Sequence, residues 1–326
     1  MQGKVPSENS AARPTYCGID VCKRWLDVAV HPNGQTMHVE NSAKGFKALK
    51  RLLAKHPIAL VAVEATGKYH RAVHRALHEA GLAVAVVNPL RARLFAESKG
   101  YLEKTDKIDA MVLAMMAEAM QPDAITPLPE DLEALEELRR ARQAAVDDQT
   151  ALSNQLGETK AALLRRLVSK RLDQIAAIIA KIEAEIENLI GRDSALARRC
   201  EIVRSIPGIG PVASVALVVG LCELGTCSAK QAAKLVGLAP IAKDSGQSKG
   251  QRHIRGGRVD VRRALYMPAM SAIKHNPGLK AFYDRLIDNG KLHKVAITAV
   301  MRKLVGLANT LLTENRCWLP EAPKTT

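Results

Sequence analysis

The stretch YCGIDVCKRWLDVAV, residues 16–30, decides the fold of the first part of this chain. It has the apolar and β-branched composition of two strands separated by a short polar bend. The sequence Pro32-Asn33-Gly34 comes next and is typical of a hairpin turn before the short run TMHVE. These residues therefore predict a β-meander at the start of the fold.

Helix and strand patterns alternate downstream of this meander. Residues 43–55 carry apolar side chains at helical spacing, and residues 69–80 form a second helical pattern that ends at a glycine. The continuous apolar runs at 58–63 and 82–87 are typical of buried strands. The alternation predicts an α/β layer fold with a central mixed sheet.

The rest of the chain has a different composition. Residues 126–199 lack strand patterns and carry Ile175, Ile179, Ile182, Ile186 and Leu189 at the alternating spacing of a coiled-coil seam. We expect two long helices with a break near residues 167–173, which would form an antiparallel hairpin or dimerise. The sequence SIPGIG then predicts a tight turn between two helices, as in a helix-hairpin-helix element, within a mainly α-helical carboxy-terminal domain. We divide the chain into a disordered leader (1–14), an α/β domain (15–125), a helical coiled-coil linker (126–199), a carboxy-terminal domain (200–315) and a tail (316–326).

Charge and composition limit the classes of protein. The 326 residues include 48 Lys and Arg against 33 Asp and Glu, a net charge of +15, and residues 200–326 hold 19 of the basic but 8 of the acidic side chains. Such a concentration of cations favours nucleic acid as the partner. We expect no transmembrane helix, no secretory signal, free cysteine thiols and a cytoplasmic location with action at the nucleoid.

Four acidic residues stand in apolar surroundings or at helical spacing. Asp20 lies within the first predicted strand, Glu64 ends a later strand, and Asp106 and Asp109 share one face of a helix. An ionised carboxylate is costly to bury unless a partner such as a divalent cation neutralises it. Each residue alone has a simpler explanation as a turn or helix-terminal charge. Together, they predict a site for one or two Mg²⁺ ions that act in phosphoryl transfer.

Several short motifs follow one another in a recognisable order. They are GID (18–20), VEATG (63–67), VVNP (86–89), KTDKIDA (104–110), IPGIG (206–210), GLAP (237–240), DSG (244–246) and RRALYM (262–267). In this order the chain resembles insertion-sequence transposases that join a RuvC-like DEDD domain to a serine-bearing carboxy-terminal transposase domain, the bridge-RNA-guided recombinases.

The resemblance implies a fold, a site and partners. It implies a ribonuclease H-like first domain in which Asp20, Glu64, Asp106 and Asp109 bind Mg²⁺, and a catalytic serine at Ser245 that forms a covalent phosphoserine link with DNA. It also implies a dimer that assembles into a tetramer, donor and target DNA as substrates, and a structured guide RNA that selects them.

The surroundings of Ser245 are strongly basic. A serine hydroxyl is a weak nucleophile, and nearby cations would stabilise the charge that develops on an attacked phosphate. Ser248 is the second candidate nucleophile, whereas Tyr266 is expected to pack in the core. The residues predicted to contact nucleic acid are Lys243, Lys249, Arg252, Arg255, Arg258, Arg262, Arg263, Gly208 and Gly210, with Lys68, Arg71, Arg91, Arg93 and Lys99 in the first domain.

Two other functions stay open at this point. In a junction-resolving nuclease the four carboxylates alone would hydrolyse DNA, and Ser245 would be structural. In an architectural DNA-binding protein neither the carboxylates nor the serine would be needed. A covalent protein-DNA adduct separates the recombinase from the nuclease, and loss of cleavage in Asp106→Asn separates both enzymes from the architectural protein.

Overall fold

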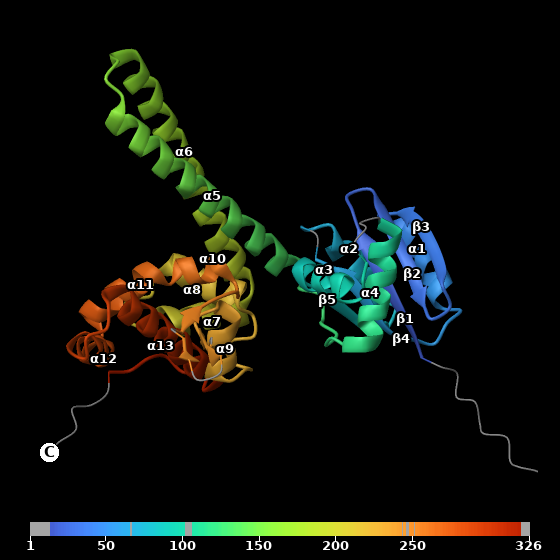
Figure 1. The fold of residues 1–326 in the computed structure, drawn as a ribbon. Helices are drawn as coiled ribbons and strands as arrows, with labels where there is room; N and C mark the ends of the chain where they lie inside the picture. The colour runs from blue at the N-terminus through green and yellow to red at the C-terminus, as the bar shows by residue number, and fades with distance from the viewer. Residues whose placement is uncertain are drawn as a thin grey trace, which may run out of the picture. The chain divides into compact units, whose positions relative to one another are not determined.

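A computed structural model describes residues 14–65, 67–101, 106–242, 244–245, 248–250 and 252–320. The chain divides into two compact units, Met1–Leu128 and Pro129–Thr326, whose colours run from blue to green and from green to red in Figure 1. The predicted leader, except Pro14, lies outside the described residues, and so do residues 321–326 of the predicted tail.

A five-stranded mixed sheet forms the centre of the first unit. Its strand order is β3-β2-β1-β4-β5, with β1 antiparallel to β2, β2 antiparallel to β3, and β1, β4 and β5 parallel to one another. The strands are β1 (Thr15–Val21), β2 (Trp25–His31), β3 (Gln35–Glu40), β4 (Ile58–Glu64) and β5 (Val84–Val87). The meander and the mixed sheet that the sequence predicts are confirmed.

Helices cover both faces of this sheet. Residues of α1 (Ala43–Leu53) and α2 (His70–His78) share one core with alternate strand residues such as Ile19 and Val63. Residues of α3 (Pro89–Ser98) and α4 (Asp106–Met120) share a second core with strand residues that point to the other face of the sheet, such as Leu60 and Ala62. This mixed α/β arrangement is compatible with a ribonuclease H-like domain.

The contact between β1 and α4 depends on a glycine. A Cβ atom on Gly18 would overlap the Ala110 carbonyl oxygen and the Ala114 amide nitrogen, so only glycine allows the helix backbone to lie directly on the strand. Asp20 lies two residues further along β1, on the same face of the sheet. The close approach therefore determines where the first turn of α4 lies relative to that carboxylate.

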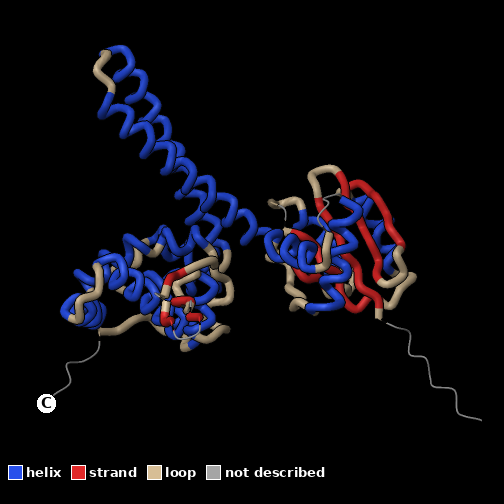
Figure 2. Tube along the Cα trace, viewed as in Figure 1, coloured by secondary structure: helices blue, strands red, loops and turns tan. Residues whose placement is uncertain are grey.

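A long helical hairpin opens the second unit. The helices α5 (Glu130–Glu158) and α6 (Ala162–Arg192) run antiparallel, and Figure 2 shows the loop that joins them at the far end. The predicted break near residues 167–173 is wrong, since α6 continues through this stretch, which contains neither glycine nor proline, and Val168 is buried. The chain turns at residues 159–161 instead, where Thr159 and Ala161 have extended backbone conformations.

The remainder of the second unit consists of short helices around α13 (His293–Thr313), which contacts α7, α9, α11 and α12. The helices are α7 (Ser194–Arg204), α8 (Pro211–Gly220), α9 (Ala229–Val236), α10 (Val259–Ala264), α11 (Tyr266–His275) and α12 (Pro277–Asp288). Between α9 and α10 lie the short strands β6 (Pro240–Ile241), β7 (Asp244–Ser245), β8 (Ser248–Lys249) and β9 (His253–Ile254). The mainly helical character predicted for this part of the chain is confirmed.

Helix α13 differs from one sequence expectation. By length and composition it could span a membrane, although the sequence analysis expected no such segment. About 50% of its most apolar window is buried inside the protein, and Arg302 and Lys303 lie near its middle. These features are those of the central helix of a folded domain.

The role of Gly18 predicts a specific loss of stability. We expect Gly18→Ala to lower the free energy of unfolding of the first unit by about 3 kcal/mol, because the added methyl group displaces α4. The fluorescence of Trp25 on β2, recorded during urea unfolding in a Trp318→Phe background, reports this unit alone. Gly157→Ala is the matched control: Gly157 lies in α5 of the second unit with open space around it, so this variant should leave the Trp25 transition unchanged. An unchanged Trp25 transition in Gly18→Ala would contradict this account.

Candidate active site

Two of the predicted carboxylates lie on neighbouring parallel strands at the same level. Ile19 of β1 pairs with Val63 of β4, so the next residue of each strand, Asp20 and Glu64, brings a carboxylate to the same end of the sheet. Both belong to the face covered by α3 and α4, because side chains alternate along a strand and the neighbouring Gly18 contacts α4. Both residues are half-buried.

The direction of α4 brings a third carboxylate to this end. Near the end of α4, Glu118 accepts a hydrogen bond of 2.9 Å from His31 Nε2, and His31 pairs with Tyr16 near the start of β1. Earlier residues of α4 contact Gly18, further along β1. The helix therefore runs antiparallel to β1, and its first turns, with Asp106 and the half-buried Asp109, lie toward the end that carries Asp20.

The donor set suits a hard divalent cation, which prefers carboxylate oxygens. Asp20 Oδ1 also accepts a hydrogen bond of 2.9 Å from the backbone amide of Val21, which limits the rotation of this side chain. Among the described residues no three His, Cys, Asp or Glu side chains form a complete cation site. The side chain of Asp106, the fourth predicted ligand, lies outside the described residues.

A further carboxylate near this site was missed by the sequence analysis. Asp27 of β2 lies directly opposite Asp20 in the antiparallel ladder and therefore on the same face of the sheet. Its Oδ1 accepts a hydrogen bond of 2.9 Å from His38 Nδ1 on β3. The alternation in WLDVAV could have revealed this position, because Asp27 has the same strand phase as Ala29 and His31.

Asn41 joins the two loops that follow the carboxylate-bearing strands. Its Nδ2 donates to the carbonyl oxygens of Cys22 (3.0 Å), just after β1, and Tyr69 (3.1 Å), just before α2. Both loops are thereby fixed near the end of the sheet that carries Asp20 and Glu64. No motif in the sequence indicates this role.

His70 begins α2 close to the same loops. Its Nδ1 is buried without a hydrogen-bond partner among the described residues. Burial lowers the pKa of His70 to about 4, helped by the charges of Arg71 and His74 and opposed by a hydrogen bond with the backbone of Gly67. The ring is therefore neutral at pH 7.

The predicted nucleophile lies in a small double hairpin in the second unit. Strands β7 and β8 pair antiparallel, with Ser245 directly opposite Ser248, and the flanking strands β6 and β9 pair outside them. The side chains of residues 243–249, and thus those of Lys243, Ser245, Ser248 and Lys249, lie outside the described residues. The backbone therefore places both candidate serines at neighbouring positions without distinguishing them.

Two of the residues predicted to contact nucleic acid form bonds within the protein. Arg258 forms a bidentate ion pair with Glu223 (2.5 and 2.6 Å), which raises the pKa of Arg258. Arg262 Nη1 donates to the carbonyl oxygens of Gly256 (2.6 Å) and Val236 (3.1 Å). These bonds fix the base of the double hairpin, whereas Arg252, Arg255 and Arg263 are exposed.

The predicted glycine contacts and Tyr266 also have defined positions. Gly208 has a φ of 101°, and a Cβ there would lie 2.7 Å from the Ala272 amide of α11, so packing requires this glycine. Gly210 is exposed and precedes α8. The expectation that Tyr266 packs in the core is wrong: its exposed fraction is 40%, because the fully buried Leu265 takes the inward position where α10 passes into α11.

The basic residues predicted in the first unit show no single pattern. Arg93 pairs with Glu97 at 2.8 Å along α3, and the Lys99 ammonium lies 5.8 Å from the centre of the Phe95 ring. Arg91 is exposed on the same helix. Lys68 and Arg71 flank the loop that contains Tyr69. Their predicted contact with nucleic acid stays a prediction.

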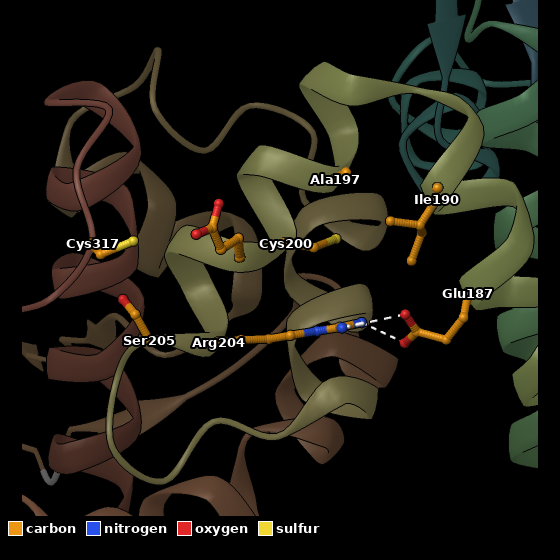
Figure 3. A pocket seen from close by; sticks show the side chains of 9 residues that line it. Glu187, Ile190, Ala197, Cys200, Arg204, Ser205 and Cys317 are labelled. Atoms are coloured by element: carbon orange, nitrogen blue, oxygen red, sulfur yellow. Dashed lines mark hydrogen bonds and ion pairs between the residues drawn. The ribbon is translucent and has the colours of Figure 1, made fainter.

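A cavity of about 490 Å³ lies between α6, α7 and Cys317 (Figure 3). An ion pair between Arg204 and Glu187 crosses it and joins α7 to α6. Burial raises the pKa of its Cys200 thiol to about 11, so this thiol is protonated and unreactive at neutral pH. Neither the ion pair nor the thiol therefore indicates a reactive group in this cavity.

Comparison with known proteins finds two family models that match this chain, and both describe transposases. A family model described as a transposase (DEDD type, IS110) matches residues 17–165, and a model described as the transposase IS116/IS110/IS902 family matches residues 200–284. The first span contains the four predicted carboxylates, and the second contains Ser245.

Individual relatives carry related descriptions. The chain is 29% identical over 314 residues to the pilin gene-inverting protein of Moraxella bovis, covering 93% of this chain and 97% of that protein. It is 30% identical over 193 residues to the uncharacterized 42 kDa protein of insertion element IS900 of Mycobacterium paratuberculosis, covering 56% and 47%. It is also 30% identical over 192 residues to the uncharacterized 44.8 kDa protein of insertion element IS116 of Streptomyces clavuligerus, covering 57% and 45%.

The pKa of His70 predicts how stability depends on pH. The unfolded histidine has a pKa near 6.5, above the folded value of about 4, so the unfolded state binds a proton first as the pH falls. We expect the first unit to lose about 1 to 2 kcal/mol between pH 7 and pH 5, after allowance for partial exposure of the ring. Urea unfolding followed by Trp25 fluorescence at both values measures the loss. His70→Gln should remove most of it, and an equal loss in this variant would disprove the assignment.

Proposed function

The chain belongs to the IS110/IS116 family of transposases and is thus an enzyme of DNA cleavage and transfer, and from this premise we propose how it acts. It cuts and rejoins DNA by a serine nucleophile, Ser245, together with a cation site formed by Asp20, Glu64, Asp106 and Asp109. A guide RNA selects the DNA. The observation that carries the proposal is the convergence of Asp20, Glu64 and the start of α4 at one end of the sheet.

The cation site supplies charge at the scissile phosphate. Asp20 and Glu64 from the sheet, with Asp109 and Asp106 from α4, would hold one or two Mg²⁺ ions. A bound divalent cation stabilises the negative charge that develops on the phosphate oxygens during transfer. The hydrogen bond from the Val21 amide restricts the rotation of the Asp20 side chain before any ligand binds.

The serine supplies the covalent step. The Ser245 hydroxyl loses its proton and attacks the phosphorus of a DNA phosphodiester, so that a P–O bond to serine forms as the bond to one deoxyribose oxygen breaks. The released oxygen takes up a proton and becomes a hydroxyl group. Attack of a hydroxyl from the other DNA partner on the phosphoserine then rejoins the strands and restores the serine. Bond energy is conserved, so no external energy source is needed.

The helical hairpin supports the proposal of an oligomer. Leu163, Leu164 and Leu167 are exposed at the start of α6, next to the loop of the hairpin, and Ile178 is exposed further along the helix. Apolar side chains repeated along one helix favour pairing with another copy, as in a coiled coil. We propose a homodimer formed through this hairpin that assembles into a tetramer on two DNA partners. The match to a pilin gene-inverting protein covers 93% of this chain, and inversion of a DNA segment requires strand exchange at its two ends.

The serine step predicts a covalent adduct. We expect the purified protein, mixed with its guide RNA, DNA and Mg²⁺, to form a protein-DNA species that survives denaturing electrophoresis and disappears in Ser245→Ala. The loss should be at least about 1000-fold, since no other group restores the nucleophile. Mass spectrometry of the trapped species should locate the phosphate on Ser245.

Two control variants are compared with Ser245→Ala. Ser248→Ala should retain the adduct, and so should Tyr266→Phe. Strand cleavage without any adduct would favour a hydrolytic nuclease and contradict the proposal. An adduct that persists in Ser245→Ala but disappears in Ser248→Ala or Tyr266→Phe would assign the nucleophile elsewhere.

The carboxylates predict metal-dependent cleavage separate from DNA binding. We expect Asp20→Asn and Asp106→Asn each to lower Mg²⁺-dependent cleavage by about 100-fold or more, while DNA binding in EDTA changes little. Asp173→Asn, which alters an exposed carboxylate on α6, should cleave normally. Normal cleavage in both site variants would refute the proposed cation site. Thermal unfolding of each variant distinguishes loss of function from loss of folding.

A further inference from the structure

Two adjoining cavities follow one side of α13. The first, of about 820 Å³, is bounded by α13, the segment Gly290–Leu292 and the outer strands β6 and β9. The second, of about 690 Å³, is bounded by α13 and α9. Pro240 and Arg302 line both, so the two cavities adjoin. We call this pair of cavities the α13 groove.

The α13 groove is basic. Its lining includes Arg252, Lys291, Lys294 and Arg302 in the first cavity and Lys230 and Lys303 in the second. No Asp or Glu occurs between residues 289 and 313, and none is among the described residues that line either cavity. Unlike Arg258 and Arg262, the exposed Lys291, Lys294 and Arg302 are available to an outside ligand, since they form no ion pair within the described part of the chain.

The spacing of the cations suits a repeating anion. Lys294, Thr298 and Arg302 follow one another at intervals of four residues and so lie along one face of α13, and Lys291 lies just before the helix begins. From Lys294 to Arg302 the helix rises about 12 Å, at about 1.5 Å per residue. A nucleic-acid strand carries its phosphates at several positions over such a length.

The groove also presents apolar side chains beside the cations. Leu292 is 76% exposed and Val295 52%, and Ile254 of β9 lies on the opposite wall. The second cavity has small residues where α13 meets α9, since a Cβ on Gly306 would lie 3.7 Å from Ala229 Cβ. Apolar side chains can contact the sugars and unpaired bases of a single strand, whereas the bases of a duplex are stacked inside the helix.

We propose that the α13 groove binds one unpaired nucleic-acid strand, with its phosphates on Lys291, Lys294, Arg302 and Arg252 and its sugars and bases against Leu292, Val295 and Ile254. The wall made by β6 and β9 is the outer pair of the double hairpin whose inner pair carries Ser245. A strand in the groove therefore leads to that hairpin. Binding of a strand does not depend on the proposed function. The role of that strand, as DNA to be cut or as guide RNA, rests on it.

Binding can be measured without chemistry. In a Ser245→Ala background with EDTA, fluorescence anisotropy gives the affinity for a 20-nucleotide single strand of DNA, the same sequence as RNA, and the DNA duplex, over a range of salt concentrations. We expect Lys294→Ala with Arg302→Ala to weaken binding of at least one single strand by about fivefold or more. The slope of log affinity against log salt should fall by about 1.4, or 0.7 for each lost phosphate contact.

Matched variants test the two parts of the proposal. Arg171→Ala with Lys181→Ala removes two exposed cations from α6 and should leave the single-strand slope unchanged. Leu292→Ser with Val295→Ser should weaken single-strand binding more than duplex binding. The arm that weakens, DNA or RNA, identifies the strand.

The inference is overturned if the double cation variant has the affinity and salt slope of the α6 control on both single strands, or if only duplex binding weakens. These outcomes are separate from the fate of the proposed function. A Ser245 adduct with unaltered strand binding in the groove variants would reject the groove alone. Weakened strand binding without any adduct in the active protein would reject the serine step and retain the groove.

Discussion

The direct contact between Gly18 and the backbone of α4 is the constraint on which the candidate cation site depends. A side chain at this position would hold the helix away from the sheet, and the carboxylates on α4 would move with it. Because Asp20 and Glu64 occupy equivalent levels of adjacent parallel strands, their arrangement with Asp109 depends on how α4 lies on the sheet. A residue with no functional group thus controls the geometry of residues that have one.

The cations of the second unit divide into two groups. Arg258 and Arg262 use their guanidinium donors on Glu223 and on backbone carbonyls, so they hold the double hairpin in place. The cations of α13 lie on the exposed side of a helix whose other side is buried, and their charges face solvent. Clustering in the sequence therefore does not identify the cations that are available to a ligand. A cation that bonds to carboxylates or carbonyl oxygens of the protein is less available, and these bonds are visible only in the folded structure.

The sequence predicts the first unit well because its patterns are local. Alternating apolar residues, the turn at Pro32-Asn33-Gly34 and the run 58–63 each determine their own element, and these elements then leave one arrangement of Asp20 and Glu64. It predicts less where tertiary contacts decide. The hairpin turn near Thr159 and the outward position of Tyr266 depend on how whole helices pack, whereas the place of Asp27 on the sheet follows from a local alternation that the prediction did not use. The side chain of Ser245 lies outside the described residues, and its role comes from the family resemblance.

Helix α13 forms the centre of the second unit and also one wall of the groove. Residues such as Ile297 and Leu304 are fully buried on one side, while Lys294 and Arg302 lie on the other. A ligand that binds only the folded helix stabilises the fold by mass action, to an extent set by its concentration relative to its dissociation constant. Occupancy of the groove would thereby protect the whole unit from unfolding and proteolysis. A transposase produced without its nucleic acid would be the shorter-lived form, which would link the amount of enzyme in the cell to the supply of its ligand.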